Sequence, residues 1–218
     1  MSPELAARFI DVIGALLLFT TILILAATQI YRAVYAVAWQ SACLGLAGAV
    51  LGAATHNVDL WIIAVITIGL KSLFLPWLLL RVVRRVGIQL ELEPVIPIAV
   101  TLAVASAVVV LSFYLGASLG TVRQAISGNA LPVGVALTLL GVLIMASQRK
   151  AITQMVGLFV SENGIFFTAM AVSQGMPLII EIGVILDVIL GALVMGILVL
   201  RVRSAVDADI ASLDELKG

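Results

Sequence analysis

Long runs of apolar residues, separated by short polar segments, dominate the pattern of this chain. Each run has about 20 residues, the length that an α-helix needs to cross roughly 30 Å of hydrocarbon. The pattern predicts seven spans, at about residues 9–30, 34–54, 60–80, 95–115, 131–148, 152–174 and 178–200. We therefore expect an all-α, polytopic membrane protein. The boundary between the first two runs, at Tyr31 and Arg32, is the one least marked by polar residues.

Composition supports this fold class and excludes others. The 218 residues are 63% hydrophobic and only 11% charged, whereas a soluble domain carries about 25% charged residues. The net charge is zero, so the charge balance gives no sign of nucleic-acid binding. The single cysteine, Cys43, excludes an internal disulfide, and the sequence has no cluster of metal ligands. The first run is too long for a signal-peptide core, so we expect it to be retained as a span.

The distribution of basic residues predicts an orientation. The N-terminal segment and the loops after the second, fourth and sixth runs hold only Arg8 and Arg123. The opposite side holds Arg32, Arg81, Arg84, Arg85, Arg149, Lys150, Arg201, Arg203 and Lys217. Because basic loops stay in the cytoplasm, the N-terminus is expected outside and the C-terminus inside.

Three ionisable residues lie in the middle of predicted spans: Lys71, Glu162 and Asp187. Each is roughly 15 Å from its helix end, by the rise of an α-helix, and therefore near the bilayer midplane. A charge at that depth costs at least about 2.5–3.5 kcal/mol, and such residues usually pair inside the bundle and mark ion or proton paths. The sequence leaves open whether Lys71 pairs with Glu162 or with Asp187. It also leaves open that the carboxyls only hydrogen-bond between helices and that Lys71 is a structural counter-ion.

Other polar residues are secondary candidates. Ser161 and Asn163 flank Glu162, and we interpret them as helix-packing groups or as minor members of the same path. Glu181 follows Pro177 and fits a solvated carboxylate at a helix N-terminus, or a further member of the path.

Small residues surround the aspartate of the last run. Gly183 and Gly191 lie one turn from Asp187 on its own face, and Ala192 and Gly196 form a second pair. Small residues let a neighbouring helix come close, so we expect the last span to make a tight contact at its titratable group.

The residues after Arg203 form a polar tail, 204–218. Its apolar positions recur at three- and four-residue spacing and are Val206, Ile210, Leu213 and Leu216. This spacing is compatible with a short amphipathic helix, and a frayed acidic tail is an equally good interpretation.

Several of these features resemble a known family. Arg149–Lys150 as a short turn, Gly157–Leu158 before a mid-helix carboxylate with Asn163, and a last helix with an acid four residues before a glycine are similar to the K-type subunit of respiratory complex I and its antiporter relatives. The whole length, with Leu70–Lys71 through Leu79 in the third run, resembles hydrogenase-4 component E. That subunit is the larger counterpart in group 4 nickel–iron hydrogenases and formate hydrogenlyases.

The resemblance divides the chain into three parts. Residues 131–203 are similar to the three-helix K-type subunit, residues 1–130 form a four-helix extension, and 204–218 is the tail. The K-type subunit carries one glutamate in each of its last two helices, and Asp187 matches the second. The first falls at Phe159, whereas the carboxylate here is Glu162, nearly one turn later on about the same face.

The resemblance also implies a function. It implies a non-catalytic subunit of a redox-driven proton or sodium pump in the cytoplasmic (inner) membrane of a prokaryote. Glu162, Asp187 and Lys71 would serve ion transfer or coupling between subunits. The partners implied are antiporter-like subunits, a quinone-site-like membrane subunit and a peripheral hydrogenase module, which would carry nickel–iron and iron–sulfur centres. This chain has no cofactor motif of its own. A stand-alone ion or solute carrier and a purely structural membrane anchor are the alternatives.

Overall fold

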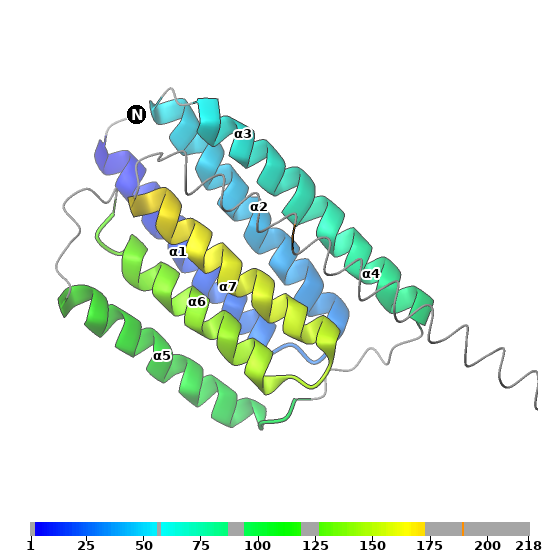
Figure 1. Cartoon of the computed structure of the whole chain (residues 1–218). Coiled ribbons are helices and arrows are strands. Elements are labelled where there is room, and N and C mark those ends of the chain that lie inside the picture. The colour runs from blue at the N-terminus through cyan, green and yellow to red at the C-terminus, as the bar shows by residue number, and fades with distance from the viewer. Residues whose placement is uncertain (1–2, 56–57, 87–93, 119–126, 173–188, 190–218) are drawn as a thin grey trace, which may run out of the picture.

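The described part of the computed structural model is built from helices (Figure 1). It covers residues 3–55, 58–86, 94–118, 127–172 and 189. The elements are α1 (Pro3–Leu25), α2 (Ile30–Thr55), α3 (Val58–Ile66), the π-helix η1 (Thr67–Phe74), α4 (Leu75–Val86), α5 (Ile98–Ser118), α6 (Ala130–Ser147) and α7 (Ala151–Val172). An isolated antiparallel β-bridge joins Pro94 to Gln148.

The length and apolar character of the helices are consistent with a membrane protein. Five segments of the described chain are long and apolar enough to cross a bilayer: Glu4–Leu25, Ile30–Ala53, Val58–Arg81, Ile98–Gly116 and Ala130–Ser147. Helix α7 is another long helix, at the position of the sixth predicted span. The seventh predicted span lies outside the described residues, as does the tail.

The helices run up and down in one bundle (Figure 1). Helices α6 and α7 form an antiparallel hairpin that packs on α1 and α2, so the two parts of the chain that were distinguished by resemblance share one core. Segments α3, η1 and α4 follow one another as a continuous rod along α2. Helix α5 lies at the opposite edge of the bundle, against α6 and α1. Only 17% of its apolar segment is buried.

The turn between α1 and α2 corrects the first predicted boundary. Helix α1 ends at Leu25 and α2 begins at Ile30, so Tyr31 and Arg32 belong to the first turn of α2 rather than to a loop. The amide of Ala33 donates to the carbonyl of Gln29 at 3.3 Å, as in a helix that starts there. Ile30, the first residue of α2, is fully buried. The helix therefore begins at a packed apolar residue, and the nearby Arg32 does not mark a loop.

Glycines set the distance between α6 and α7. A Cβ added to Gly157 would lie 2.7 Å from the carbonyl oxygen of Gly141, and one added to Gly164 would lie 2.8 Å from that of Gly134. Gly141 therefore faces Gly157, and Gly134 faces Gly164, which lets the two backbones touch. Ser161, Glu162 and Asn163 lie between these two contacts, so the hairpin fixes their depth.

The third span contains a π-helical segment that the apolar pattern did not predict. At its end the amide of Leu75 donates to the carbonyl of Leu70, five residues earlier. Pro76 follows directly; its ring would clash with the carbonyl of Ser72 in a regular α-helix, and it lacks an N–H donor. A wider turn before Pro76 relieves this conflict. Lys71 lies in the π-helical segment.

Candidate functional site

Lys71 and Glu162 form an ion pair inside the bundle. Lys71 Nζ lies 2.9 Å from Glu162 Oε1, and the side chains are only 3% and 4% exposed. Helix η1 carries the lysine and α7 carries the glutamate. Phe166, one turn after Glu162, places its ring centroid 5.8 Å from Nζ, so the aromatic face also stabilises the cation. The structure therefore brings together two of the three predicted midplane charges.

The pair lies in a layer of polar side chains at mid-depth. One apolar core cluster includes Ile24, Leu25, Ile30, Leu75, Leu140 and Phe159. A second cluster includes Ile10, Leu17, Leu44, Ile63, Leu137 and Phe167. Along α1, α2, the rod and α7, the buried polar residues come between the two clusters: Thr20, Thr21, Gln40, Ser41, Thr67, Lys71, Ser161, Glu162 and Asn163. We call these nine residues the polar layer.

Asn163 extends the layer from α7 to α2. Its side-chain amide nitrogen donates to Gln40 Oε1 and to Ser41 Oγ, both at 3.2 Å. Gln40 in turn donates to the carbonyl of Leu17 at 3.0 Å and to Thr21 Oγ1 at 2.9 Å. A hydrogen-bonded chain therefore runs through three helices, beginning next to the ion pair.

Thr20 and Thr21 of α1 are oriented to accept hydrogen bonds from the side chain of Gln40. Thr21 Oγ1 donates to the carbonyl of Leu17, and Thr20 Oγ1 donates within its own helix to the carbonyls of Leu16 and Leu17, all at 2.9 Å. Because each hydroxyl donates its proton to a carbonyl of α1, its lone pairs can accept a hydrogen bond from the side-chain amide of Gln40. The direction of donation along the chain is thereby fixed, from Asn163 through Gln40 to α1.

Asn163 carries an acceptor that the described residues do not satisfy. Asn163 Oδ1 is fully buried and accepts no hydrogen bond from them. An unmet buried acceptor costs about 1–3 kcal/mol, so this position is poorly explained by packing alone. The unmet oxygen lies on the residue next to Glu162.

Ser161 and Asn163, the two secondary candidates next to Glu162, lie at contacts between helices. Ser161 is buried, and its backbone nitrogen lies against the position that a Cβ on Gly141 would take, which fits the interpretation of a packing residue. Asn163 also packs between helices, but through a specific set of hydrogen bonds. Asp187 and Glu181 lie outside the described residues.

Sequence reasoning missed the part of the layer on α1 and α2. Gln40 and Ser41 are adjacent polar residues in the middle of the second apolar run, which is a usable signal because uncompensated polar groups are costly in hydrocarbon. Thr20 and Thr21 gave a weaker signal, since a threonine can hydrogen-bond within its own helix.

A second polar contact lies at the end of the bundle where α1 begins. Asp11 accepts hydrogen bonds from Ser127 Oγ and, at 3.3 Å, from Asn129 Nδ2. These bonds tie α1 to the segment that leads into α6. Asp11 therefore has a structural role at this end of the bundle. Among the described residues, no three His, Cys, Asp or Glu side chains gather as a metal site.

The fold and the site define a helical membrane protein whose bundle encloses an ion pair in a polar layer. No family model matches this chain, and no solved structure matches it. A curated relative is the uncharacterized protein Rv0085 of Mycobacterium tuberculosis, which is 29% identical over 219 residues that cover the whole of both chains. The similarity therefore extends over the complete length rather than over a single helical hairpin.

Proposed function

We propose that this chain is a non-catalytic membrane subunit of a redox-driven ion-pumping complex, with the pair Lys71–Glu162 as its central element. The observation that carries the proposal is the ion pair itself, buried at mid-depth with an N–O distance of 2.9 Å. Ionisable groups inside a membrane are costly and typically serve ion or proton paths. Asp187 is the third member, assigned from its mid-span position in the sequence.

In the proposed mechanism the pair responds to charge in neighbouring subunits. Interactions between charges are strong where the effective dielectric is low, so a charge that arrives nearby changes the balance between the ionised and neutral forms of Glu162. Lys71 compensates the negative charge of Glu162 while the two are paired. In the proposed path, movement of the lysine away from Glu162 accompanies transfer of a proton to the carboxylate, and its return accompanies release.

The π-helical segment supplies a way for Lys71 to move. Single π-helical turns inside α-helices are rare and occur frequently at functional sites. A shift between π- and α-helical winding in residues 67–74 would rotate Lys71 relative to α7. This couples the conformation of η1 to the protonation of Glu162.

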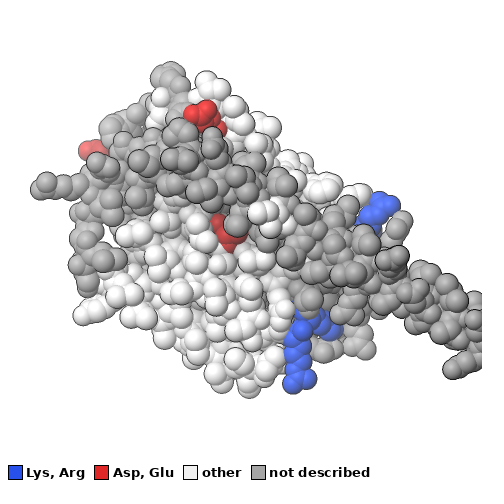
Figure 2. All heavy atoms as spheres, in the orientation of Figure 1, with Lys and Arg blue, Asp and Glu red and all other residues white. Residues whose placement is uncertain are grey.

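The charge distribution supports the proposed orientation, with the N-terminus outside and the C-terminus in the cytoplasm. Basic residues of the described part gather at one end of the bundle: Arg32, Arg81, Arg84, Arg149 and Lys150. Glu4, Asp11 and Asp59 lie toward the other end, together with Arg8. Figure 2 shows blue spheres toward the end where α4 finishes and red spheres toward the opposite end or near the middle. The proposed location is the cytoplasmic membrane of a prokaryote.

The proposal is tested by what the chain assembles with. The full chain is purified from its native membrane in a mild detergent, and the co-purifying proteins are identified by mass spectrometry. We expect antiporter-like subunits together with a module that contains nickel–iron or iron–sulfur centres. Recovery of the chain alone, or as a homo-oligomer, would instead favour a carrier that works by itself and would overturn the proposal.

A further inference from the structure

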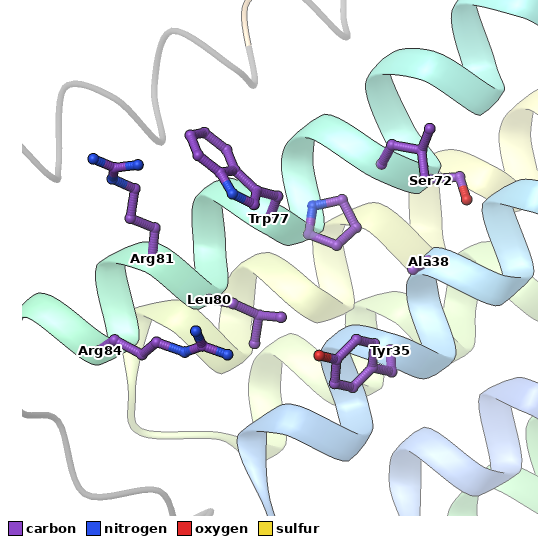
Figure 3. Close-up of a pocket in the computed structure, with 9 residues that line it drawn as sticks. Tyr35, Ala38, Ser72, Trp77, Leu80, Arg81 and Arg84 are labelled. Atoms are coloured by element: carbon purple, nitrogen blue, oxygen red, sulfur yellow. The ribbon is translucent and has the colours of Figure 1, made fainter.

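A groove runs between α2 and the rod on the outer surface of the bundle (Figure 3). Its volume is about 630 Å³. Tyr35 rises from α2 opposite Leu80 and Arg84 of α4, and Ala38 and Ser72 lie farther from the arginines. The groove is separate from the polar layer, because Lys71 points into the bundle whereas Leu73, two residues later, is 65% exposed.

The lining of the groove changes character along its length. Leu73 and Pro76 make the part toward mid-membrane apolar, Trp77 follows, and Arg81 and Arg84 lie at the basic end of the bundle. From residue 73 to residue 84 the helix rises about 16 Å, close to the roughly 15 Å of one hydrocarbon leaflet. The length of the groove therefore matches one leaflet, which would place its cationic groups at the level of the lipid headgroups.

The two arginines are available to an anion. Arg81 lies over the ring of Trp77, with Cζ 5.1 Å from the ring centroid, which holds the guanidinium in place. In the described part of the chain no ion pair joins Arg81 or Arg84 to a carboxylate, and no acidic residue lines the groove. A guanidinium presents its N–H donors in a planar fork that matches two phosphate oxygens.

We propose that this groove binds one anionic phospholipid of the leaflet on the basic side. The phosphate lies between Arg81 and Arg84, and one acyl chain lies along Leu73 and Leu80. Basic pockets between spanning helices on the cytoplasmic side bind acidic headgroups in this way. The match of charge at one end and apolar depth along the rest favours a lipid over a free anion or a partner helix. The proposal is independent of the proposed function.

The experiment uses Trp77 as its reporter. The chain has three tryptophans, and Trp39→Phe with Trp61→Phe leaves only the one in the groove. The full chain is placed in phosphatidylcholine nanodiscs that contain increasing fractions of brominated phosphatidylglycerol or of brominated phosphatidylcholine. We expect half-maximal quenching at a lower fraction of the anionic lipid, about fivefold for each arginine that contacts the phosphate and therefore about 25-fold for the two.

Three variants assign the effect to the groove. Arg81→Gln with Arg84→Gln removes the difference between the two lipids. Arg149→Gln with Lys150→Gln takes two charges from the same end of the bundle, outside the groove, and keeps it. Ala38→Phe fills the apolar part while both arginines remain, and lowers quenching by both lipids.

Each contrary outcome overturns the proposal. Equal quenching by the two lipids would show that the groove does not select the anionic headgroup, or that a protein segment occupies it. Loss of the difference in the Arg149/Lys150 variant would assign the effect to general surface charge. Displacement of phosphatidylglycerol by inorganic phosphate alone, or an unchanged result with Ala38→Phe, would remove the acyl chain from the site.

Discussion

At the scale of single residues, the energetic effect of substituting Lys71 or Glu162 depends on whether the other member of the buried pair is present. Removing one member of a buried ion pair leaves an uncompensated charge, whereas replacing both with neutral side chains of similar size is often tolerated. Lys71 and Glu162 are therefore better tested together than singly.

We predict that Glu162→Gln destabilises the bundle by about 3–5 kcal/mol, because it removes the carboxylate charge that lies 2.9 Å from the buried Lys71 ammonium. The double variant Lys71→Met with Glu162→Gln should recover most of that loss. Thermal unfolding in detergent measures both. Glu4→Gln, the same substitution at an exposed carboxylate, is the control and should unfold like the unsubstituted chain. A double variant no better than the single one would show that the pair has no mutual dependence.

Asp187, in the last predicted span, gives the test of coupling. Under the proposed function, Asp187→Asn leaves the complex assembled and its redox turnover measurable, but lowers the number of ions transferred per turnover. Proton or sodium uptake into vesicles, normalised to turnover, checks this. Normal pumping by the variant would remove Asp187 from the ion path.

At this scale the sequence identified the ionisable residues within apolar runs, but it did not identify the residues that they contact. Lys71 and Glu162 stand out because an ionisable residue in an apolar run is costly whatever surrounds it. Their pairing could not be read from the chain, because it depends on η1 and α7 lying in one bundle. Gln40 was overlooked for the same reason: its importance comes from Asn163 and Thr21 on other helices.

At the scale of elements, the α6–α7 hairpin positions the site. The two facing pairs of glycines bring the backbones together, and side chains there would push them apart. The spacing Gly134–Gly141 repeats in Gly157–Gly164, so the sequence did contain this contact, although only the hairpin arrangement shows which glycines face one another.

We predict that Gly141→Val lowers stability by about 1–3 kcal/mol, the usual cost of overpacking, because the valine side chain meets the backbone of Ser161. Gly69→Ala is the matched control, since a Cβ at that position meets nothing within 4 Å. Unfolding midpoints of the two variants in the same detergent give the comparison. Equal midpoints would contradict the close contact.

The third span shows the limit of an apolar pattern. Its length and position were predicted correctly from hydropathy, but a run of apolar residues does not distinguish π- from α-helical winding. Pro76 was the available signal, because a proline inside a helix requires some local adjustment. Which adjustment occurs depends on neighbours, including the burial of Lys71 against α7.

At the scale of the whole molecule, the asymmetry of charge between the two ends predicts how the bundle sits in the membrane. In a Cys43→Ala background, we expect Asp59→Cys to react with a membrane-impermeant thiol reagent added to intact cells, and Arg149→Cys to react only after the cells are opened. The two positions serve as controls for each other. The reverse labelling would invert the proposed orientation.

The polar layer between the two apolar clusters also has an electrical consequence. Moving one elementary charge across a membrane costs about 2.3 kcal/mol per 100 mV, so a charge that travels only to mid-depth experiences about half of that. Under the proposed function, a proton that reaches Glu162 from either side would cross roughly half of the transmembrane field. Proton transfer through this carboxylate would then depend on membrane voltage as well as on pH.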